Sequence, residues 1–386
     1  MDKNNAIQGI VQPAQKKGIE MIKKNIACIG LVLMLIVLVL QCVVSPVENE
    51  ASDEPKVFFT QRLNQSGYFE WISIKKQAIE NTGFPVFHDA MVKTYKKDVY
   101  IIERFGADNI IKYDPSKNGK NGLVNQMKTD SAEGSNPQDI AFLSDTKAFI
   151  ANQNKPAITL FNPLTLTKTG TIDISKYTYM KDRNTSPHAS SLEIDGNYLY
   201  VLLQRRDGYT YKIPSLILKI NMLTNEIEDT VSTVYKNGNK IICNNGYLYV
   251  MNTGSYSAAA GDAGIEAVKL SDKSVTTVIT AEGLGGCPYN VQHKNGDIFY
   301  VTVYVTYHNV HVKEIDFSTG NIVAVVPDVN DAFGGICYDK KNNTLYVGEC
   351  DSLNMGIKVF KNNILQGPVI KTSRTLIPSS IAIINE

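Results

Sequence analysis

Leu199-Tyr200-Val201 is one copy of a short pattern, an aromatic residue between two apolar ones, that recurs along the chain. The other copies are Val99-Tyr100-Ile101, Ala148-Phe149-Ile150, Leu248-Tyr249-Val250, Phe299-Tyr300-Val301 and Leu345-Tyr346-Val347. Their central aromatic residues are separated by 49, 51, 49, 51 and 46 residues. Such a regular period over six copies is typical of a repeat protein in which each repeat is one supersecondary unit.

The residues around each copy predict short antiparallel strands. Turns rich in Asn, Asp and Gly, such as Asp195-Gly196-Asn197 and Asn295-Gly296-Asp297, precede the pattern. These residues tolerate the positive φ angles of tight hairpins. A second apolar strand, such as Ile158 to Phe161, follows most copies. Three or four short antiparallel strands per period predict one blade of a β-propeller.

The two ends of the chain decide the number of blades. Residues 378–383 (PSSIAI) resemble the innermost strand at residues 137–142 (PQDIAF), yet no blade follows them. Residues 57–60 and 69–72 supply the missing second and third strands. We therefore predict an all-β fold, a seven-bladed β-propeller over residues 56–386 whose N- and C-terminal strands share the closing blade. Pairing the two ends removes two exposed sheet edges.

The first 55 residues predict export and attachment to a membrane. Residues 26–44 are nearly all apolar and follow Lys16, Lys17, Lys23 and Lys24, as in a signal peptide or an uncleaved anchor. Residues 1–44 are therefore predicted to be a signal or anchor segment, with Met21 as an alternative start. Residues 45–55 are polar and bracketed by Pro46 and Pro55, which predicts a tether. The expected location is extracytoplasmic, in the cell envelope and membrane-anchored.

Composition excludes functions that depend on strong charge. The chain carries 39 basic and 38 acidic residues, a net charge of +1. Nucleic-acid binding, which requires a basic surface, is therefore not predicted.

Four stretches resemble the YVTN-type, surface-layer-protein-like propellers, and more narrowly a group of bacterial propeller lipoproteins that includes corrinoid-binding surface proteins. They are residues 103–109 (ERFGADN), 136–141 (NPQDIA), 202–205 (LLQR) and 355–360 (MGIKVF). This resemblance covers residues 56–386 and implies the fold rather than a function. Cys42 resembles the acylated cysteine of bacterial lipoproteins, although Leu40 and Gln41 replace the small residues that those signals favour. Lipidation at Cys42 and an uncleaved anchor both stay open.

The candidate binding residues follow from the expected fold. In a propeller, the innermost strand of each blade starts, and the second strand ends, on the same face. Polar groups converging there can orient a ligand, or they can cap strand ends and solvate the face. The predicted ligand-binding residues are His88, Asp89, Arg104, Asp139, Asn152, His188, Arg205, Asn252, Tyr289 and Glu349.

Arg104 and Arg205 are expected at equivalent positions in two blades, each just after its aromatic strand. Two guanidinium groups on one face would suit a carboxylate or a phosphate. The alternative is that each forms an ion pair between blades.

Cysteine and histidine spacing predicts little further chemistry. Four cysteines follow the tether, and an even number in an oxidising compartment permits disulfides. Cys287 and Cys350, expected near one rim in adjacent blades, are the predicted pair. No zinc-type spacing or cofactor motif occurs, so neither a metal site nor a cofactor is predicted.

Two functional hypotheses result. The first is a binding module for a small molecule, a peptide or an envelope protein. The second is a metal-assisted hydrolase or lyase similar to the lactonase and streptogramin-lyase propellers, which the fold permits but for which no ligand set can be assigned.

Overall fold

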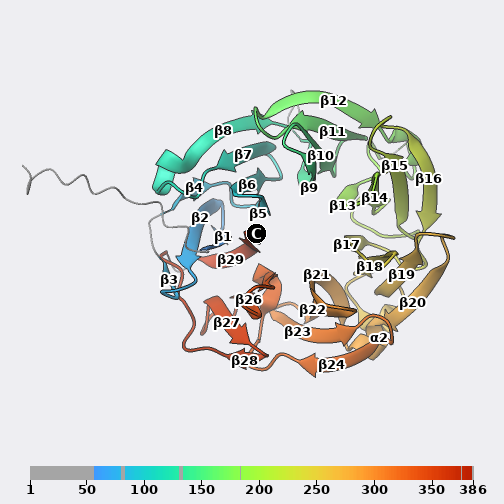
Figure 1. Cartoon of the computed structure of the whole chain (residues 1–386). Coiled ribbons are helices and arrows are strands. Elements are labelled where there is room, and N and C mark those ends of the chain that lie inside the picture. The colour runs from blue at the N-terminus through green and yellow to red at the C-terminus, as the bar shows by residue number, and fades with distance from the viewer. Residues whose placement is uncertain (1–55, 80–82, 130–133, 183, 375, 385–386) are drawn as a thin grey trace, which may run out of the picture. The chain divides into compact units, whose positions relative to one another are not determined.

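The computed structural model describes residues 56–79, 83–129, 134–182, 184–374 and 376–384. The predicted signal or anchor segment, the tether and Cys42 lie outside these residues. The described residues form seven small antiparallel sheets arranged in a ring, which confirms the seven-bladed β-propeller (Figure 1).

The blades are numbered in chain order, and each runs from its innermost to its outermost strand. Blade 1 contains β29 (Ile377–Ile383), β1 (Lys56–Leu63), β2 (Ser66–Ser73) and β3 (Ala78–Ile79), with β4 (Phe84–Val86) also paired to β2. Blade 2 contains β5 (Ala90–Tyr95), β6 (Asp98–Glu103), β7 (Asn109–Tyr113) and β8 (Leu123–Lys128). Blade 3 contains β9 (Pro137–Ser144), β10 (Lys147–Asn152), β11 (Ala157–Asn162) and β12 (Thr167–Asp173). Blade 4 contains β13 (Ala189–Asp195), β14 (Tyr198–Leu203), β15 (Leu216–Asn221) and β16 (Ile227–Ser232).

The other three blades follow the same order. Blade 5 contains β17 (Gly238–Asn244), β18 (Tyr247–Asn252), β19 (Gly264–Lys269) and β20 (Val275–Thr280). Blade 6 contains β21 (Cys287–Asn295), β22 (Ile298–Thr306), β23 (Asn309–Asp316) and β24 (Asn321–Val325). Blade 7 contains β25 (Ile336–Asp339), β26 (Thr344–Glu349), β27 (Gly356–Lys361) and β28 (Ile364–Leu365). Short helical turns lie between strands: η1 (Gly119–Gly122), η2 (Ser175–Tyr177), η3 (Ala258–Ala260), η4 (Ala332–Gly334) and α2 (Ala281–Leu284).

Blade 1 closes the ring as predicted. Its innermost strand, β29, comes from the C-terminus and pairs antiparallel with β1, so that Phe58 lies opposite Ala382. On one side of this blade Ile381 and Ile383 pack against blade 7. On the other side Ala382 and Ile384 pack toward blade 2. Both faces of the shared blade are therefore buried.

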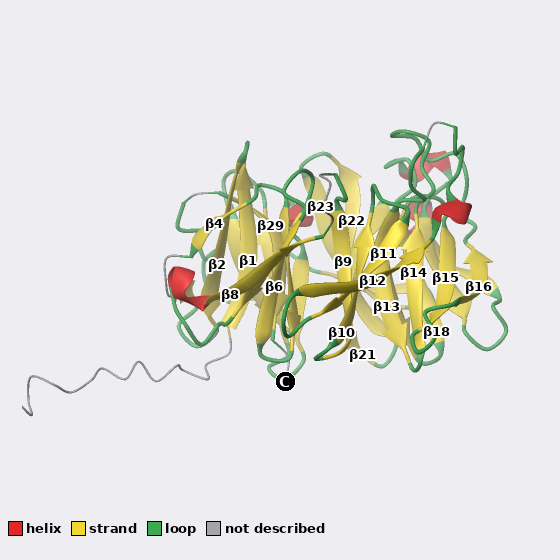
Figure 2. Ribbon diagram, turned by 90° about the horizontal axis from the view of Figure 1, so that it is seen from above, coloured by secondary structure: helices red, strands yellow, loops and turns green. Residues whose placement is uncertain are grey.

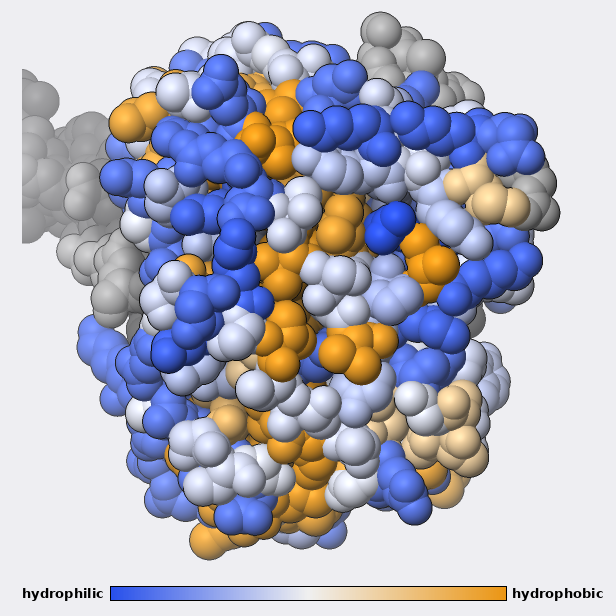
Figure 3. Space-filling view, turned by 90° about the vertical axis from the view of Figure 1, so that its right-hand side faces the viewer, coloured by the Kyte–Doolittle hydropathy of each residue, from blue (hydrophilic) through white to orange (hydrophobic). Residues whose placement is uncertain are grey.

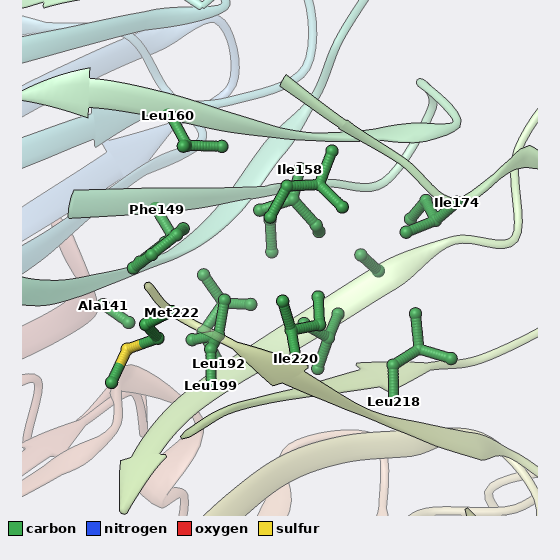
Figure 4. Packing of buried hydrophobic residues seen from close by; sticks show 14 of the residues in the cluster. Ala141, Phe149, Ile158, Leu160, Ile174, Leu192, Leu199, Leu218, Ile220 and Met222 are labelled. Atoms are coloured by element: carbon green, nitrogen blue, oxygen red, sulfur yellow. The ribbon is translucent and has the colours of Figure 1, made fainter. Parts of the chain in front are cut away.

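The recurring aromatic pattern forms the core because successive residues of a strand face opposite sides of the sheet. In β10, Phe149 packs against blade 4, whereas Ala148 and Ile150 pack against blade 2. Phe149 has no exposed surface and lies among side chains of blades 3 and 4, such as Leu199 (Figure 4). Burying such a side chain contributes about 1.5 to 3 kcal/mol, so each copy of the pattern joins a blade to both neighbours.

The predicted disulfide between Cys287 and Cys350 is not formed, and Cys243 and Cys337 are also free thiols. Cys287 packs with Ala263 and Ala281, against blade 5. The Cys350 thiol instead donates to the carbonyl oxygen of Pro378 in blade 1, at 3.3 Å. The two thiols therefore turn toward opposite neighbours, although their blades are adjacent.

The side view shows where the long loops gather (Figure 2). We call the face where innermost strands begin and second strands end the upper face, because it points upward in that view. Loops above blades 3 to 5, comprising residues 174–182, 184–188, 204–215 and 253–263, rise beyond the rest of this face. No helix in the described part of the chain is long and apolar enough to cross a membrane.

Candidate functional site

Arginine is confined to segments of the upper face. The chain has six arginines. Five are described: Arg62 near the end of β1, Arg104 directly after β6, Arg205 and Arg206 after β14, and Arg374 shortly before β29. The sixth, Arg183, lies outside the described residues. Lysines occur on both faces, so the upper face is distinguished by the planar cation that best binds carboxylate and phosphate.

Four of these arginines have no acidic partner within the described residues: Arg62, Arg205, Arg206 and Arg374. Arg374 lies over the ring of Tyr68, with its guanidinium carbon 4.1 Å from the ring centroid. The Nε atoms of Arg205 and Arg206 are buried and donate to no hydrogen-bond partner. Burial lowers the pKa of the Arg205 guanidinium from its ordinary value, as expected for a cation that loses contact with water and gains no negative partner. Arg62 lies over the ring of Phe333, with its guanidinium carbon 5.6 Å from the ring centroid. An anionic ligand would supply the charge these side chains lack.

Arg104 is already engaged in the protein. It forms an ion pair with Asp89 at 2.5 Å and donates to the side-chain oxygen of Gln138 in blade 3 at 2.9 Å. The ion pair lies within blade 2, because Asp89 directly precedes β5, and only the hydrogen bond to Gln138 crosses to another blade. The alternative of an ion pair between blades is therefore not what Arg104 forms. Only its Nε atom is buried without a partner.

The expected equivalence of Arg104 and Arg205 is wrong by one residue. The backbone N–H of Arg104 donates to Asp89, the residue before β5, and the N–H of Gln204 donates to His188, the residue before β13. Gln204 is therefore the counterpart of Arg104. Arg205 is one residue further on, with a positive φ of 54°. The error arose because Arg104 follows its aromatic residue by four positions and Arg205 by five.

A chain of side-chain amides links blades 3 to 5 across the upper face. Asn136 donates to Gln153 at 2.8 Å, Gln153 to Gln204 at 3.1 Å, and Gln204 to Asn237 at 2.9 Å. Asn237 then donates to the carbonyl oxygen of Gly254 at 2.9 Å. This network fixes the bases of the raised loops, so the side chains they carry are held in place.

His188 and His88 both lie on the upper face, as predicted. His188 is 8% exposed and its Nδ1 atom has no hydrogen-bond partner. Burial, together with the nearby charge of Arg206, lowers the pKa of His188 to about 4. Its imidazole is therefore neutral at neutral pH. His88 is half-buried beside Phe87, with ring centroids 4.3 Å apart, and its Nδ1 atom also lacks a partner.

Three predicted binding residues serve mainly to hold strands and loops. The carboxylate of Glu349 has no exposed surface and accepts from the backbone N–H groups of Asn330, Asp331 and Asp351 and from Lys358. Asn252 donates to Glu266 at 2.7 Å. Asn152 donates to Ala157 and Thr159 at 2.9 Å each. Each of the three is at most 1% exposed, which fits the strand-capping alternative.

Asp139 lies deeper, on the innermost strand β9. Its carboxylate pairs with Lys93 of blade 2 at 2.5 Å and Lys240 of blade 5 at 2.8 Å, and accepts from Ser191 and Leu192 of blade 4. Burial alone would raise the pKa of Asp139, but the two lysine charges outweigh it and hold the pKa well below its ordinary value. Asp139 thus joins four blades around the axis and has no free site for a ligand.

Tyr289, at the start of β21, marks the centre of the upper face. Burial raises the pKa of its hydroxyl above the ordinary value. The charges of Arg104 and Arg62 act in the opposite direction, so both guanidinium groups lie within electrostatic reach of this phenol. The phenol of Tyr211, from a raised loop of blade 4, also influences it. The side chains that influence this phenol of blade 6 thus belong to blades 1, 2 and 4.

The described residues do not provide the donor set of a metal site. They contain no group of three or more His, Cys, Asp and Glu side chains placed to hold an ion. The two best-placed carboxylates, Asp139 and Glu349, are saturated by lysines and backbone N–H groups. A metal-assisted reaction on this face therefore has no fitting ligands among the described side chains.

A cavity of about 150 Å³ lies elsewhere, between the outer strands of blades 4 and 5. It is on the side of the ring drawn in Figure 3, where hydrophobic and hydrophilic residues alternate. Two of its cations are already engaged, Lys273 with Asp229 at 2.7 Å and Lys219 over the ring of Tyr198 at 3.7 Å. The upper face, with its unpaired arginines, is the stronger candidate.

Sequence reasoning missed Arg206, Tyr211, Tyr256 and Phe333. One signal was present: all six arginines fall in segments that the repeat places on the upper face. The aromatic residues gave no comparable signal, because they belong to loops without a repeated length.

Comparison with known proteins shows the fold alone. No family model matches the sequence, and no curated protein matches it. A protein from Bacteroides fragilis provisionally named 6-phosphogluconolactonase has a similar structure, with a TM-score of 0.58 and 16% identity over 87% of this chain and 99% of that one. A protein from Bacteroides uniformis with the same provisional name gives 0.58 and 12% over 86% and 100%. A protein from Lactobacillus plantarum gives 0.56 and 11% over 86% and 99%. This chain is thus similar in architecture to seven-bladed propellers that include proteins named as lactonases.

Proposed function

We propose that this chain is a membrane-tethered, extracytoplasmic binding protein whose upper face holds a small ligand carrying a carboxylate or a phosphate. The observation that carries the proposal is the pair Arg205 and Arg206, which have no acidic partner and bury their Nε atoms without a hydrogen-bond partner, on the face where loops converge. Partial burial of a guanidinium group without a counter-charge is costly, so the neighbouring Arg205 and Arg206 favour an external anion.

Local backbone strain supports the same face. Arg205 and His188 both have positive φ angles, of 54° and 63°. Such conformations are uncommon for residues other than glycine, and unusual backbone conformations cluster at ligand sites. The two residues are also close in space, where β13 starts and β14 ends, because the N–H of Arg205 donates to the carbonyl oxygen of Pro187, the residue before His188.

The test is calorimetric titration of the full chain with inorganic phosphate and with citrate. Replacing Arg205 and Arg206 together by Ala should weaken binding at least about tenfold, because charge-assisted hydrogen bonds are the strong ones. Arg205→Lys should already weaken it, because an ammonium group cannot reproduce the planar fork.

The matched control removes the same charge elsewhere. Lys341 and Lys361 are exposed near the turns of blade 7 on the opposite face. Replacing both by Ala should leave the affinity within about twofold, the change expected from distant, screened charges. Equal losses in the arginine and lysine variants would reduce the effect to net charge and contradict a specific site.

Membrane attachment is supported by the apolar segment at residues 26–44 and by the resemblance of Cys42 to the acylated cysteine of bacterial lipoproteins. Mass spectrometry of the mature N-terminus tests it. We expect either an acylated Cys42 or an uncleaved start at Met1 or Met21. A freely soluble protein that begins after Cys42 would refute both forms.

A lactonase of the same architecture is the second candidate, favoured by the names of two structural neighbours. An arginine-lined face would suit a phosphorylated lactone. Hydrolysis of 6-phosphogluconolactone at a rate that falls in the variant lacking Arg205 and Arg206 would favour the enzyme. Saturable binding without turnover would favour the binding protein.

A further inference from the structure

The upper face carries a cluster of aromatic side chains around the axis, and its composition specifies the ligand further. Tyr289 stacks on Phe333 of η4, with ring centroids 5.4 Å apart and an interplanar angle of 26°. Tyr256, from the raised loop of blade 5, packs edge-on against Tyr304, at 5.3 Å and 79°. Three segments distant in sequence thus bring four rings to one region.

The pairing of β21 with β22 brings the two ring pairs together, because Cys287, two residues before Tyr289, lies opposite Tyr304. Burial raises the pKa of Tyr256 above its ordinary value, and the phenols of Tyr289 and Tyr211 raise it further. The same two phenols influence each other. The phenols of Tyr211, Tyr256 and Tyr289, from blades 4, 5 and 6, thus lie within electrostatic reach of one another.

Two of these rings, Tyr304 and Phe333, pack against the hydrophobic core between blades 6 and 7, yet all of the rings keep exposed surface. Tyr211, Tyr289, Tyr304 and Phe333 are only partly buried, and Tyr256 is 41% exposed. Tyr256 also has a φ of 60°, a conformation that is strained for an aromatic residue. Its loop is held there by hydrogen bonds from Ser255 to Asp262. An aromatic side chain kept partly in solvent by a strained backbone does not serve packing alone.

Cations border the aromatic group. Arg62 lies over the ring of Phe333. The positive charges of Arg62 and Arg104 both act to lower the pKa of the Tyr289 phenol. A ring bound against Tyr289 would place an attached anionic group beside these guanidinium groups, while its flat face meets the aromatic side chains.

We propose that the ligand of the upper face contains a planar or ring-shaped apolar part next to its anionic group, and that Tyr289 and Phe333 form the surface on which this ring stacks. The proposal rests on the proposed function, because it takes an anionic ligand on this face as given. The arginines supply affinity for the anion, and the aromatic group selects which anions bind.

The experiment compares inorganic phosphate, phenyl phosphate and benzyl alcohol in titrations of the full chain. Phenyl phosphate should bind about three- to tenfold more tightly than inorganic phosphate, the range expected for one stacked ring. Benzyl alcohol, which has the ring without the anion, should bind more weakly than phenyl phosphate.

Variants assign the preference to the cluster. Tyr289→Ala should abolish the preference for phenyl phosphate over inorganic phosphate, whereas Tyr289→Phe should keep the preference. Tyr209 is the matched control, because it is an exposed tyrosine on the same raised loop as Tyr211 and has no ring contact. Tyr209→Ala should change neither affinity.

The outcomes separate the two proposals. Equal affinity of the wild-type protein for phenyl phosphate and inorganic phosphate overturns the ring inference and leaves the anion site standing. A preference that survives in both Tyr289→Ala and Phe333→Leu also overturns it. If neither inorganic phosphate nor phenyl phosphate binds, the proposed function is overturned, and the ring inference with it.

Discussion

His188 shows how one residue of the upper face links conformation, burial and charge. It has a positive φ of 63°, is 8% exposed and leaves its Nδ1 atom unpaired. The charge of Arg206 lies nearby, so a second positive charge on the imidazole is unfavourable in the folded protein. A neutral imidazole can accept or donate one hydrogen bond, which suits a ligand more than a structural ion pair.

Because its pKa is lowered, His188 should make the stability of the folded protein depend on pH. The pKa of His188 is about 4 in the folded protein and about 6.5 in an unfolded chain. Because the folded pKa is depressed, the unfolded state binds the proton first, and stability falls as the pH drops from about 6.5 to about 4. Between pH 7 and pH 5 the loss attributable to His188 should be about 2 kcal/mol.

Urea denaturation of the full chain at pH 7, 6 and 5 measures this loss. His188→Asn is the informative variant, because Asn tolerates a positive φ and does not titrate in this range. The free energy of unfolding of the variant should depend less on pH than that of the wild-type protein. Identical pH dependence in the two proteins would show that His188 is not held neutral by the fold.

At the scale of elements, the strands were predictable because the pattern that encodes them is local. Each aromatic copy lies in the second strand of its blade, from Tyr100 in β6 to Tyr346 in β26. The innermost strand β29 was identified from residues 378–383, and its pairing with β1 followed from the need to close the ring. Turn residues such as Gly196 and Gly296 have positive φ angles where the sequence placed reversals.

Positions just beyond the strands were less predictable. Arg205 was assigned one residue out of register because loops do not repeat in length as strands do. Asn152, Asn252 and Glu349 were correctly placed at strand ends, but the sequence could not show that neighbouring N–H groups and side chains occupy them. The predicted disulfide between Cys287 and Cys350 was wrong for a similar reason, because two cysteines in adjacent blades can point their thiols in different directions.

At the scale of the whole molecule, the ring creates the site. Tyr211, Tyr256 and Tyr289 belong to three blades, and Arg62 and Arg104 to two more. No spacing in the sequence relates these residues, since only closure of seven blades brings them to one axis. The Asp139 ion pairs with Lys93 and Lys240 join further blades below them, so the base of the site is held by buried polar contacts.

Closure also separates the two faces of the protein. Strand-to-strand turns on the lower face carry Asn, Asp, Gly and Lys, as at residues 244–246 and 341–343. The upper face carries all the described arginines and the raised loops (Figure 2). This asymmetry is the basis for assigning binding to one face.

Hydrogen–deuterium exchange of the full chain, with and without phenyl phosphate, tests that assignment most directly. Ligand binding should slow exchange in residues 204–215 and 253–263, whose N–H groups lie in the raised loops, because ordering a loop suppresses its local opening. The lower turns at residues 144–147 and 195–198 should exchange at unchanged rates. Protection of the lower turns, or of the cavity between blades 4 and 5, with no change in the raised loops would contradict binding on the upper face.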